Sequence, residues 1–170
     1  MAFIFALDLA DPIPTELHPA NGACAAVAYV GYDDACPLTY SIMVGFEVGA
    51  ACLEYYFKFI EADAEDYTER DYWDGREVGE FVDAASRSHI LEVVKRVTIL
   101  LIEEVRPECF YYCTHGDGLP PHALEKYHHI NEIFTGCGYR VTMTNSSGGR
   151  YSWWVEQEAH PPVVPDESSG

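Results

Sequence analysis

The stretch FTGCGYRV, residues 134–141, decides the fold because it ends a helix and opens a strand within a few residues. Upstream of it, apolar residues at helical spacing predict a helix that begins near Pro121. The inward stripe of that helix comprises Ala123, Tyr127, Ile130 and Phe134. Gly136 or Gly138 supplies the left-handed residue that terminates it, and alternation over residues 139–145 predicts the strand. The stretch therefore indicates an α+β architecture, and it says more about fold than about activity.

Both flanks of this stretch continue the alternation of strands and helices. Residues 151–156 are predicted to pair with the strand at 139–145 through a hairpin turn at 146–149. Residues 109–114 predict a short buried strand. The clearest helix spans residues 83–105, and its apolar stripe comprises Ile90, Val94, Val97 and Leu101.

The first third of the chain predicts an antiparallel meander of three strands, at residues 24–32, 38–47 and 52–60. Residues 3–9 predict one further short strand, followed by a loop up to about Gly22. Residues 61–80 predict a long connecting loop that contains at most a helical turn.

Together these elements predict one α+β domain over residues 1–157. Its order is β, βββ, α, β, α, ββ, with a mixed, mostly antiparallel sheet and two main helices. Residues 158–170 contain three prolines and end in Ser-Ser-Gly, a composition that predicts a disordered tail.

The net charge of the chain limits the classes of partner that it can bind. The chain has 170 residues, of which 28 are acidic and 10 are lysine or arginine, giving a formal net charge of −18. Such a charge repels nucleic acids and anionic membranes and attracts basic proteins and cations. We therefore expect no direct nucleic-acid or membrane partner, and a basic protein is the compatible macromolecule. A purely solubilising role for the acidity stays open as the alternative.

Cysteine usage and the amino-terminal segment indicate the compartment. The six cysteines lack the regular spacing of a zinc finger or ribbon. The first residues carry no positive n-region, and no apolar run approaches the length of a membrane span. These features predict a cytoplasmic protein with reduced thiols.

The order of meander, helix, strand, helix and hairpin resembles the core of the GNAT acyltransferase superfamily over about residues 24–157. Phe134 stands four residues before Gly138-Tyr139, where that family often has a tyrosine four residues before a Gly-Phe pair. The resemblance implies a coenzyme A cleft where the central strands diverge. The same module, without clear catalytic residues, also resembles uncharacterised proteins of phages and mobile elements.

The sequence departs from the family pattern at two places. These departures argue against the pyrophosphate binding and the acid catalysis that the resemblance implies. The family's pyrophosphate loop reads Gln/Arg-x-x-Gly-x-Gly/Ala, and the nearest match here is REVGEF, residues 76–81. That match ends in the bulky Phe81 and places Glu77 and Glu80 where a pyrophosphate would sit. The tyrosine that often serves as general acid is replaced by Phe134, which has no proton to give. We therefore expect no cofactor.

The end of the strand at 109–114 offers the candidates for a site in the cleft, namely Cys113, His115, Asp117 and His122. Zinc prefers such ligands, but their spacing matches no common zinc family. A packed strand followed by a solvated loop is the preferred interpretation, with no bound metal. A Cys–His nucleophile at Cys113 is disfavoured because a cysteine inside a strand is usually inert.

The acidic segment at residues 61–80 supplies the candidates for partner binding, which are Tyr67, Tyr72, Trp73 and Asp74. It lacks the Asp-x-Asp-x-Asp-Gly order of an EF-hand. Exposed aromatic side chains beside carboxylates would suit a basic protein partner. A merely solvated acidic loop is the alternative.

The sequence thus predicts a non-catalytic, acidic binding or interaction protein of a kind found in mobile elements. The alternative is a divergent acyltransferase, or another small-molecule enzyme, with its site in the cleft between the central strands. A homo-oligomer is compatible with both.

Overall fold

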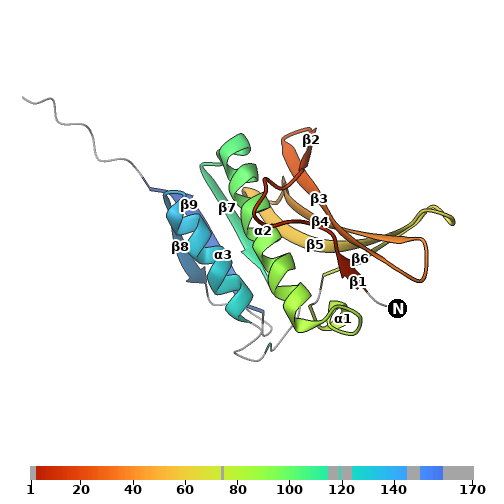
Figure 1. The fold of residues 1–170 in the computed structure, drawn as a ribbon. Helices are drawn as coiled ribbons and strands as arrows, with labels where there is room; N and C mark the ends of the chain where they lie inside the picture. The colour runs from red at the N-terminus through yellow and green to blue at the C-terminus, as the bar shows by residue number, and fades with distance from the viewer. Residues whose placement is uncertain (1–2, 74, 115–118, 120–123, 145–149, 159–170) are drawn as a thin grey trace, which may run out of the picture.

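The computed structural model describes residues 3–73, 75–114, 119, 124–144 and 150–158, which form one large sheet with two long helices on the same face (Figure 1). The strands are β1 (Phe3–Phe5), β2 (Glu16–Ala20), β3 (Ala23–Asp33), β4 (Leu38–Val48), β5 (Leu53–Asp63), β6 (Thr68–Tyr72), β7 (Cys109–Cys113), β8 (Tyr139–Thr144) and β9 (Ser152–Gln157). The helices are α1 (Gly75–Val78), α2 (Ala84–Val105) and α3 (Glu125–Gly136).

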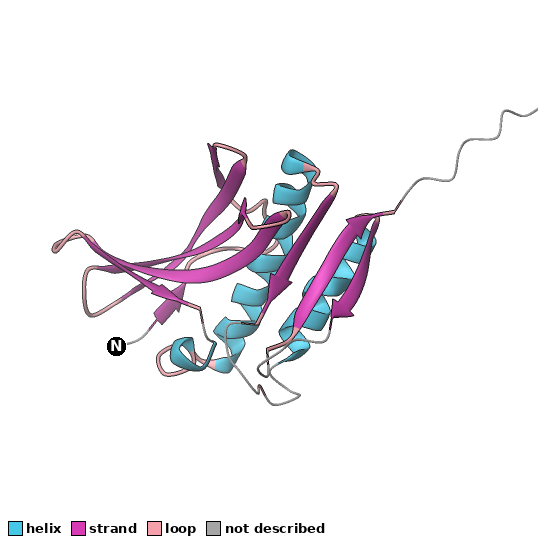
Figure 2. Ribbon diagram, turned by 180° about the vertical axis from the view of Figure 1, so that it is seen from behind, coloured by secondary structure: helices cyan, strands magenta, loops and turns pink. Residues whose placement is uncertain are grey.

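The sheet order is β1-β3-β4-β5-β7-β9-β8, with β2 also paired to β3 and β6 also paired to β5. Every pairing within the described residues is antiparallel except that of β5 with β7. Viewed from behind, the strands lie in front and the long helices behind them (Figure 2). The predicted fold class, an α+β protein with a mixed, mostly antiparallel sheet and two main helices, is confirmed.

The parallel pair at the centre of the sheet is short. β5 and β7 pair only at Leu53 with Phe110 and at Glu54 with Tyr111. Beyond these residues the two strands diverge toward their carboxyl ends (Figure 1). Because the backbones separate there, side chains of the strands and helices must occupy the space between them.

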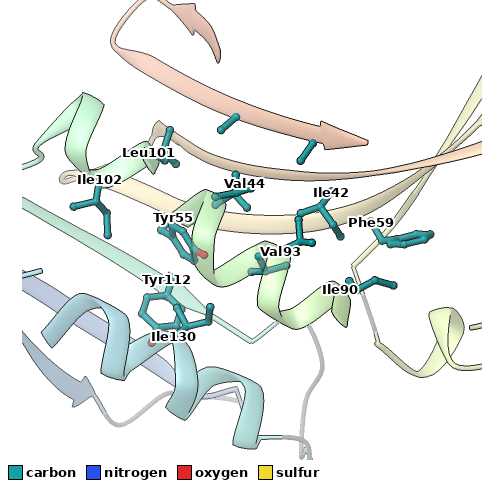
Figure 3. Close-up of a cluster of buried hydrophobic side chains, with 14 of the residues drawn as sticks. Ile42, Val44, Tyr55, Phe59, Ile90, Val93, Leu101, Ile102, Tyr112 and Ile130 are labelled. Atoms are coloured by element: carbon teal, nitrogen blue, oxygen red, sulfur yellow. The ribbon is translucent and has the colours of Figure 1, made fainter. Parts of the chain in front are cut away.

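Helix α2 is fixed at its start by a cap and along its length by burial. The Asp83 carboxylate accepts hydrogen bonds from the Ala85 and Ser86 amides at 2.8 and 2.9 Å, as expected of an N-cap. Val93 and Leu101 are fully buried, and Figure 3 shows them on the side of α2 that faces the sheet. This burial holds α2 against the meander.

Helix α3 covers the other half of the sheet through its buried Tyr127, Ile130 and Phe134. Gly138 adopts a φ of +87°, so it is the glycine with the left-handed conformation that follows the helix. The helix begins at Glu125, later than the predicted start near Pro121, and residues 120–123 lie outside the described part of the chain.

The prediction of a connecting loop is wrong for residues 61–72, whereas the helical turn that it allowed is α1. β5 continues to Asp63, β6 returns beside it, and α1 follows. The Asp63 carboxylate accepts hydrogen bonds from the Glu65 and Asp66 amides, and Tyr67 closes the turn at a φ of +55°. The hairpin forms because these local bonds make a tight turn, and the many charges in the segment conceal its strand pattern.

The predicted loop before Gly22 is also wrong in part, because Glu16–Ala20 forms the exposed edge strand β2. The predicted strand at residues 3–9 is shorter than expected and ends at Phe5. The predicted turn at 146–149 and all but the first residue of the predicted tail at 158–170 lie outside the described residues.

Candidate functional site

A cleft of about 910 Å³ lies among β5, α1 and the amino-terminal halves of α2 and α3. It is on the carboxyl-terminal side of the short pairing between β5 and β7. Phe57, Ile90 and Val94 contribute apolar side chains to its wall, and Trp73 and Tyr127 contribute aromatic rings. Its volume falls in the range of about 300–1,000 Å³ that is usual for small-molecule sites.

Positive charge gathers in this cleft. Four of the ten lysines and arginines of the chain line it, namely Lys58, Arg76, Arg87 and Lys126. The described acidic residues that line it are Glu80 and Glu125. In a protein of net charge −18, lysines and arginines therefore outnumber the described carboxylates in the lining of this cleft.

The cations are held by contacts with the surrounding walls. Lys58 Nζ lies 2.6 Å from Asp71 Oδ2 and 5.4 Å from the centre of the Trp73 ring. Lys126 Nζ lies 5.0 Å from the centre of the Tyr127 ring and 5.5 Å from that of Phe57. Such cation–π contacts place positive charge directly against the aromatic wall.

The turn between α1 and α2 comprises residues 79–83, and its first half is the end of the REVGEF match, whose first three residues lie in α1. Its amides are used within the chain: Gly79 N–H donates to Gly75, Glu80 N–H to Glu77, and Val82 N–H to Val78, at 3.0, 3.2 and 2.9 Å. Arg87 Nη1 donates to the Val82 carbonyl at 2.7 Å and closes the turn.

Phe81 and Asp83 complete this internal arrangement. The Phe81 ring packs against Tyr40 and Tyr72, with ring centres 5.7 and 5.4 Å apart, and the Asp83 carboxylate occupies the start of α2. A pyrophosphate would need those amides and that helix terminus. The turn between α1 and α2 and the start of α2 therefore do not form a binding site for a pyrophosphate.

The space where β5 and β7 diverge is filled by side chains. Tyr56, Trp73, Tyr112 and Tyr127 line a remaining cavity of only about 10 Å³ there. Tyr127 stacks on Trp153, with ring centres 5.3 Å apart and planes 15° apart. The main cleft therefore lies on the helix side of an aromatic wall.

Phe134, at the position where the resemblance implies a tyrosine, belongs to the core. Its fully buried ring lies edge-on to Tyr55, Phe110 and Tyr112, with ring centres 5.1, 4.9 and 5.6 Å away. It does not line the main cleft. This position therefore serves packing.

Among the predicted cleft residues, Cys113 is the one that the structure describes. Its thiol donates to Glu54 Oε1 at a distance of 3.8 Å. Burial raises the pKa of the Cys113 thiol, and the negative charge of Glu54 adds to this effect. A thiol held in its protonated form is a poor nucleophile. His115, Asp117 and His122 lie outside the described residues.

Glu54 also binds the neighbouring Tyr111, whose hydroxyl donates to Glu54 Oε2 at 2.7 Å. This hydrogen bond raises the pKa of Tyr111 to about 12. Glu54 therefore accepts hydrogen bonds from both Tyr111 and Cys113 on the sheet.

The predicted partner-binding residues fall in three different environments. Tyr67 is 93% exposed at the tip of the β5–β6 hairpin, and Trp73 is 37% exposed at the cleft. The expectation that Tyr72 is exposed is wrong, since it is only 6% exposed, packs on Phe59 and donates to Glu61. It is buried because it pairs with Phe59 across the two strands. Asp74 lies outside the described residues.

Sequence reasoning did not bring the four cations of the cleft together, although one of them, Arg76, stands in the motif match at residues 76–81. They come from four separate segments and form no local motif, so only their scarcity in an acidic chain could have drawn attention to them.

No group of three or more histidine, cysteine or acidic side chains in the described part of the chain could hold a metal ion. Because His115, Asp117 and His122 are outside that part, the absence of a metal stays a prediction. Among the described residues, no helix is long and apolar enough to cross a membrane.

Comparison with protein-family models, with curated proteins and with solved structures gave no match to this chain. The resemblance to the acyltransferase superfamily therefore stays an expectation, and the site has to be interpreted from its own geometry.

Proposed function

We propose that this chain is a non-catalytic binding protein that uses the cleft among β5, α1, α2 and α3. The observation that carries the proposal is the cleft itself, which has cationic and aromatic walls beside a turn whose amides are bonded internally. A cleft of this size and lining suits a small ligand.

The topology supports an acyltransferase-like ancestry for the scaffold. A meander of β3, β4 and β5 is followed by α2, the parallel strand β7, α3 and the hairpin of β8 and β9. The short, diverging β5–β7 pair is where the resemblance implies a coenzyme A site.

Three features argue against acyl transfer at this site. The start of α2 already carries the Asp83 carboxylate, which accepts hydrogen bonds from the amides of that helix terminus. Phe134 is enclosed in the core and has no proton to donate. Aromatic rings fill the space between the central strands. We therefore favour binding over catalysis, and a divergent enzyme is the alternative.

A cytoplasmic location is part of the proposal. All six cysteines are unpaired, which suits a reducing compartment.

A thermal-shift screen tests this function, because a ligand that binds only the native state raises the melting temperature. The panel contains small anionic and neutral aromatic compounds, acetyl-coenzyme A and a basic peptide. Ser88 is an exposed cleft residue on α2, so Ser88→Trp should obstruct the cleft without disturbing the core.

Leu100→Trp is the matched control, since Leu100 is a partly exposed residue of the same helix that does not line the cleft. We expect small aromatic compounds to stabilise the wild type and Leu100→Trp but not Ser88→Trp. Stabilisation by the basic peptide alone would move recognition away from the cleft.

The β5–β6 hairpin is a second candidate, as the contact for a basic protein. It presents the exposed ring of Tyr67 beside the carboxylates of Asp63, Glu65 and Asp66. Tyr67→Ala should then weaken peptide binding and leave small-ligand binding unchanged. An unchanged peptide affinity would eliminate the hairpin.

A further inference from the structure

We propose that the ligand of the cleft is an aromatic monoanion, with its anionic group at Lys126 and Arg76 and its aromatic body against Phe57 and Tyr127. This inference rests on the proposed binding function and names the chemical class of the ligand.

The first argument is the distribution of charge. Lys58, Arg76, Arg87 and Lys126 line the cleft, whereas the described acidic lining consists of Glu80 and Glu125. Charges beyond about 8 Å are strongly screened at physiological ionic strength. Lys58 is paired with Asp71 at 2.6 Å, so the cationic side of the cleft is formed by Arg76, Arg87 and Lys126. A bound anion therefore interacts more strongly with these nearby side chains than with the distant surface carboxylates.

The second argument is that two elements bring their cations to the same wall. A Cβ atom at Gly75, the first residue of α1, would lie 3.8 Å from Lys126 Nζ of α3. Lys126 therefore lies against the start of α1, and Arg76 follows immediately in the chain and also lines the cleft. An anionic group placed between α1 and α3 can interact with both.

The third argument is the aromatic surface beside the ammonium group. Lys126 Nζ lies within about 6 Å of the Phe57 and Tyr127 rings. Tyr127 is buried and held by stacking on Trp153, which fixes the wall before any ligand arrives. An aromatic ligand with an acidic substituent matches both the rings and the charge.

The fourth argument limits the size of the anionic group. The amides of Gly79 to Val82 and the start of α2 are occupied by intramolecular hydrogen bonds. A diphosphate would lack the backbone donors that it normally requires, whereas a carboxylate or sulfonate needs only one or two cationic side chains.

Two fluorescent probes that differ in charge test the inference. Anilinonaphthalene sulfonate is an aromatic monoanion, and phenylnaphthylamine is the same ring system without the sulfonate. Each is titrated into wild type, Lys126→Met and Ser88→Trp. Lys95→Met is the matched control, because Lys95 pairs with Glu92 on α2 and does not line the cleft.

We expect the sulfonate to bind wild type and Lys95→Met at least about tenfold more tightly than the neutral probe, as one charge-assisted contact allows. Lys126→Met should lose that advantage and keep the affinity for the neutral probe, while Lys126→Arg should retain the preference. Circular dichroism and urea midpoints verify that the variants remain folded.

The outcomes separate the two proposals. If both probes bind wild type equally and Lys126→Met changes neither affinity, the assignment of a monoanion is overturned and the binding function stands. If neither probe binds wild type, or both bind Ser88→Trp as well as wild type, the cleft is not the binding site and the proposed function itself fails.

Discussion

Placing a tyrosine at position 134 tests whether Phe134 serves the packing of the core. Phe134 is fully buried, and three aromatic rings lie within 4.9–5.6 Å of its centre. Phe134→Tyr would force a hydroxyl into this packed environment. Burying an unpaired hydroxyl costs about 1–3 kcal/mol, and overpacking costs a similar amount. We therefore expect the free energy of unfolding to fall by about 2–4 kcal/mol.

Urea denaturation followed by tryptophan fluorescence and circular dichroism measures this loss. Phe57→Tyr is the matched control, since Phe57 is a half-buried ring at the cleft whose added hydroxyl can reach water. It should change the free energy of unfolding by less than about 0.5 kcal/mol. A Phe134→Tyr variant as stable as wild type would show that the site accommodates a tyrosine and would refute the packing argument.

The further predictions concern two buried tyrosine hydroxyls and the thiol of Cys113. Tyr55→Phe should lower the free energy of unfolding by about 1 kcal/mol, because the Tyr55 hydroxyl bonds to Thr98 Oγ1 at 2.7 Å and Thr98 in turn donates to the Val94 carbonyl. Tyr40→Phe should leave that free energy unchanged or raise it, since the Tyr40 hydroxyl has no partner among the described residues; equal losses in the two variants by urea denaturation would contradict this reasoning. Cys113 should react with iodoacetamide more slowly than a free cysteine at about pH 8, because its raised pKa leaves less thiolate, and the rate should keep rising at higher pH. Glu54→Gln should speed the reaction by removing a neighbouring negative charge, and peptide mass spectrometry that finds Cys113 faster than a free thiol would disprove the assignment.

The elements that the sequence predicts well are those with strong apolar periodicity. Helix α2 and strands β3, β4 and β5 bury one continuous face, so their patterns are visible without tertiary information. Strand β2 is exposed throughout, and β6 is exposed except at Tyr72. Neither carries the alternation that marks a half-buried strand.

The candidate site is harder to predict from the sequence than these helices and strands, because its residues come together only in the folded chain. Lys58 and Lys126 are 68 positions apart in the sequence, and only the packing of α3 beside β5 brings both into one cleft. The sequence did indicate that residues 76–81 are unsuited to a pyrophosphate. That remains a prediction, and the structure adds a physical argument for it, since the amides of Gly79 to Val82 already have partners.

Calorimetric titration with acetyl-coenzyme A at low salt tests most directly the central claim that the cleft binds ligands but does not serve acyl transfer. The sulfonate probe serves as the positive control for an open cleft. We predict no saturable binding of acetyl-coenzyme A up to about 1 mM, a limit that corresponds to about 4 kcal/mol of binding free energy. A stoichiometric complex with a micromolar dissociation constant would contradict the account and favour the divergent acyltransferase.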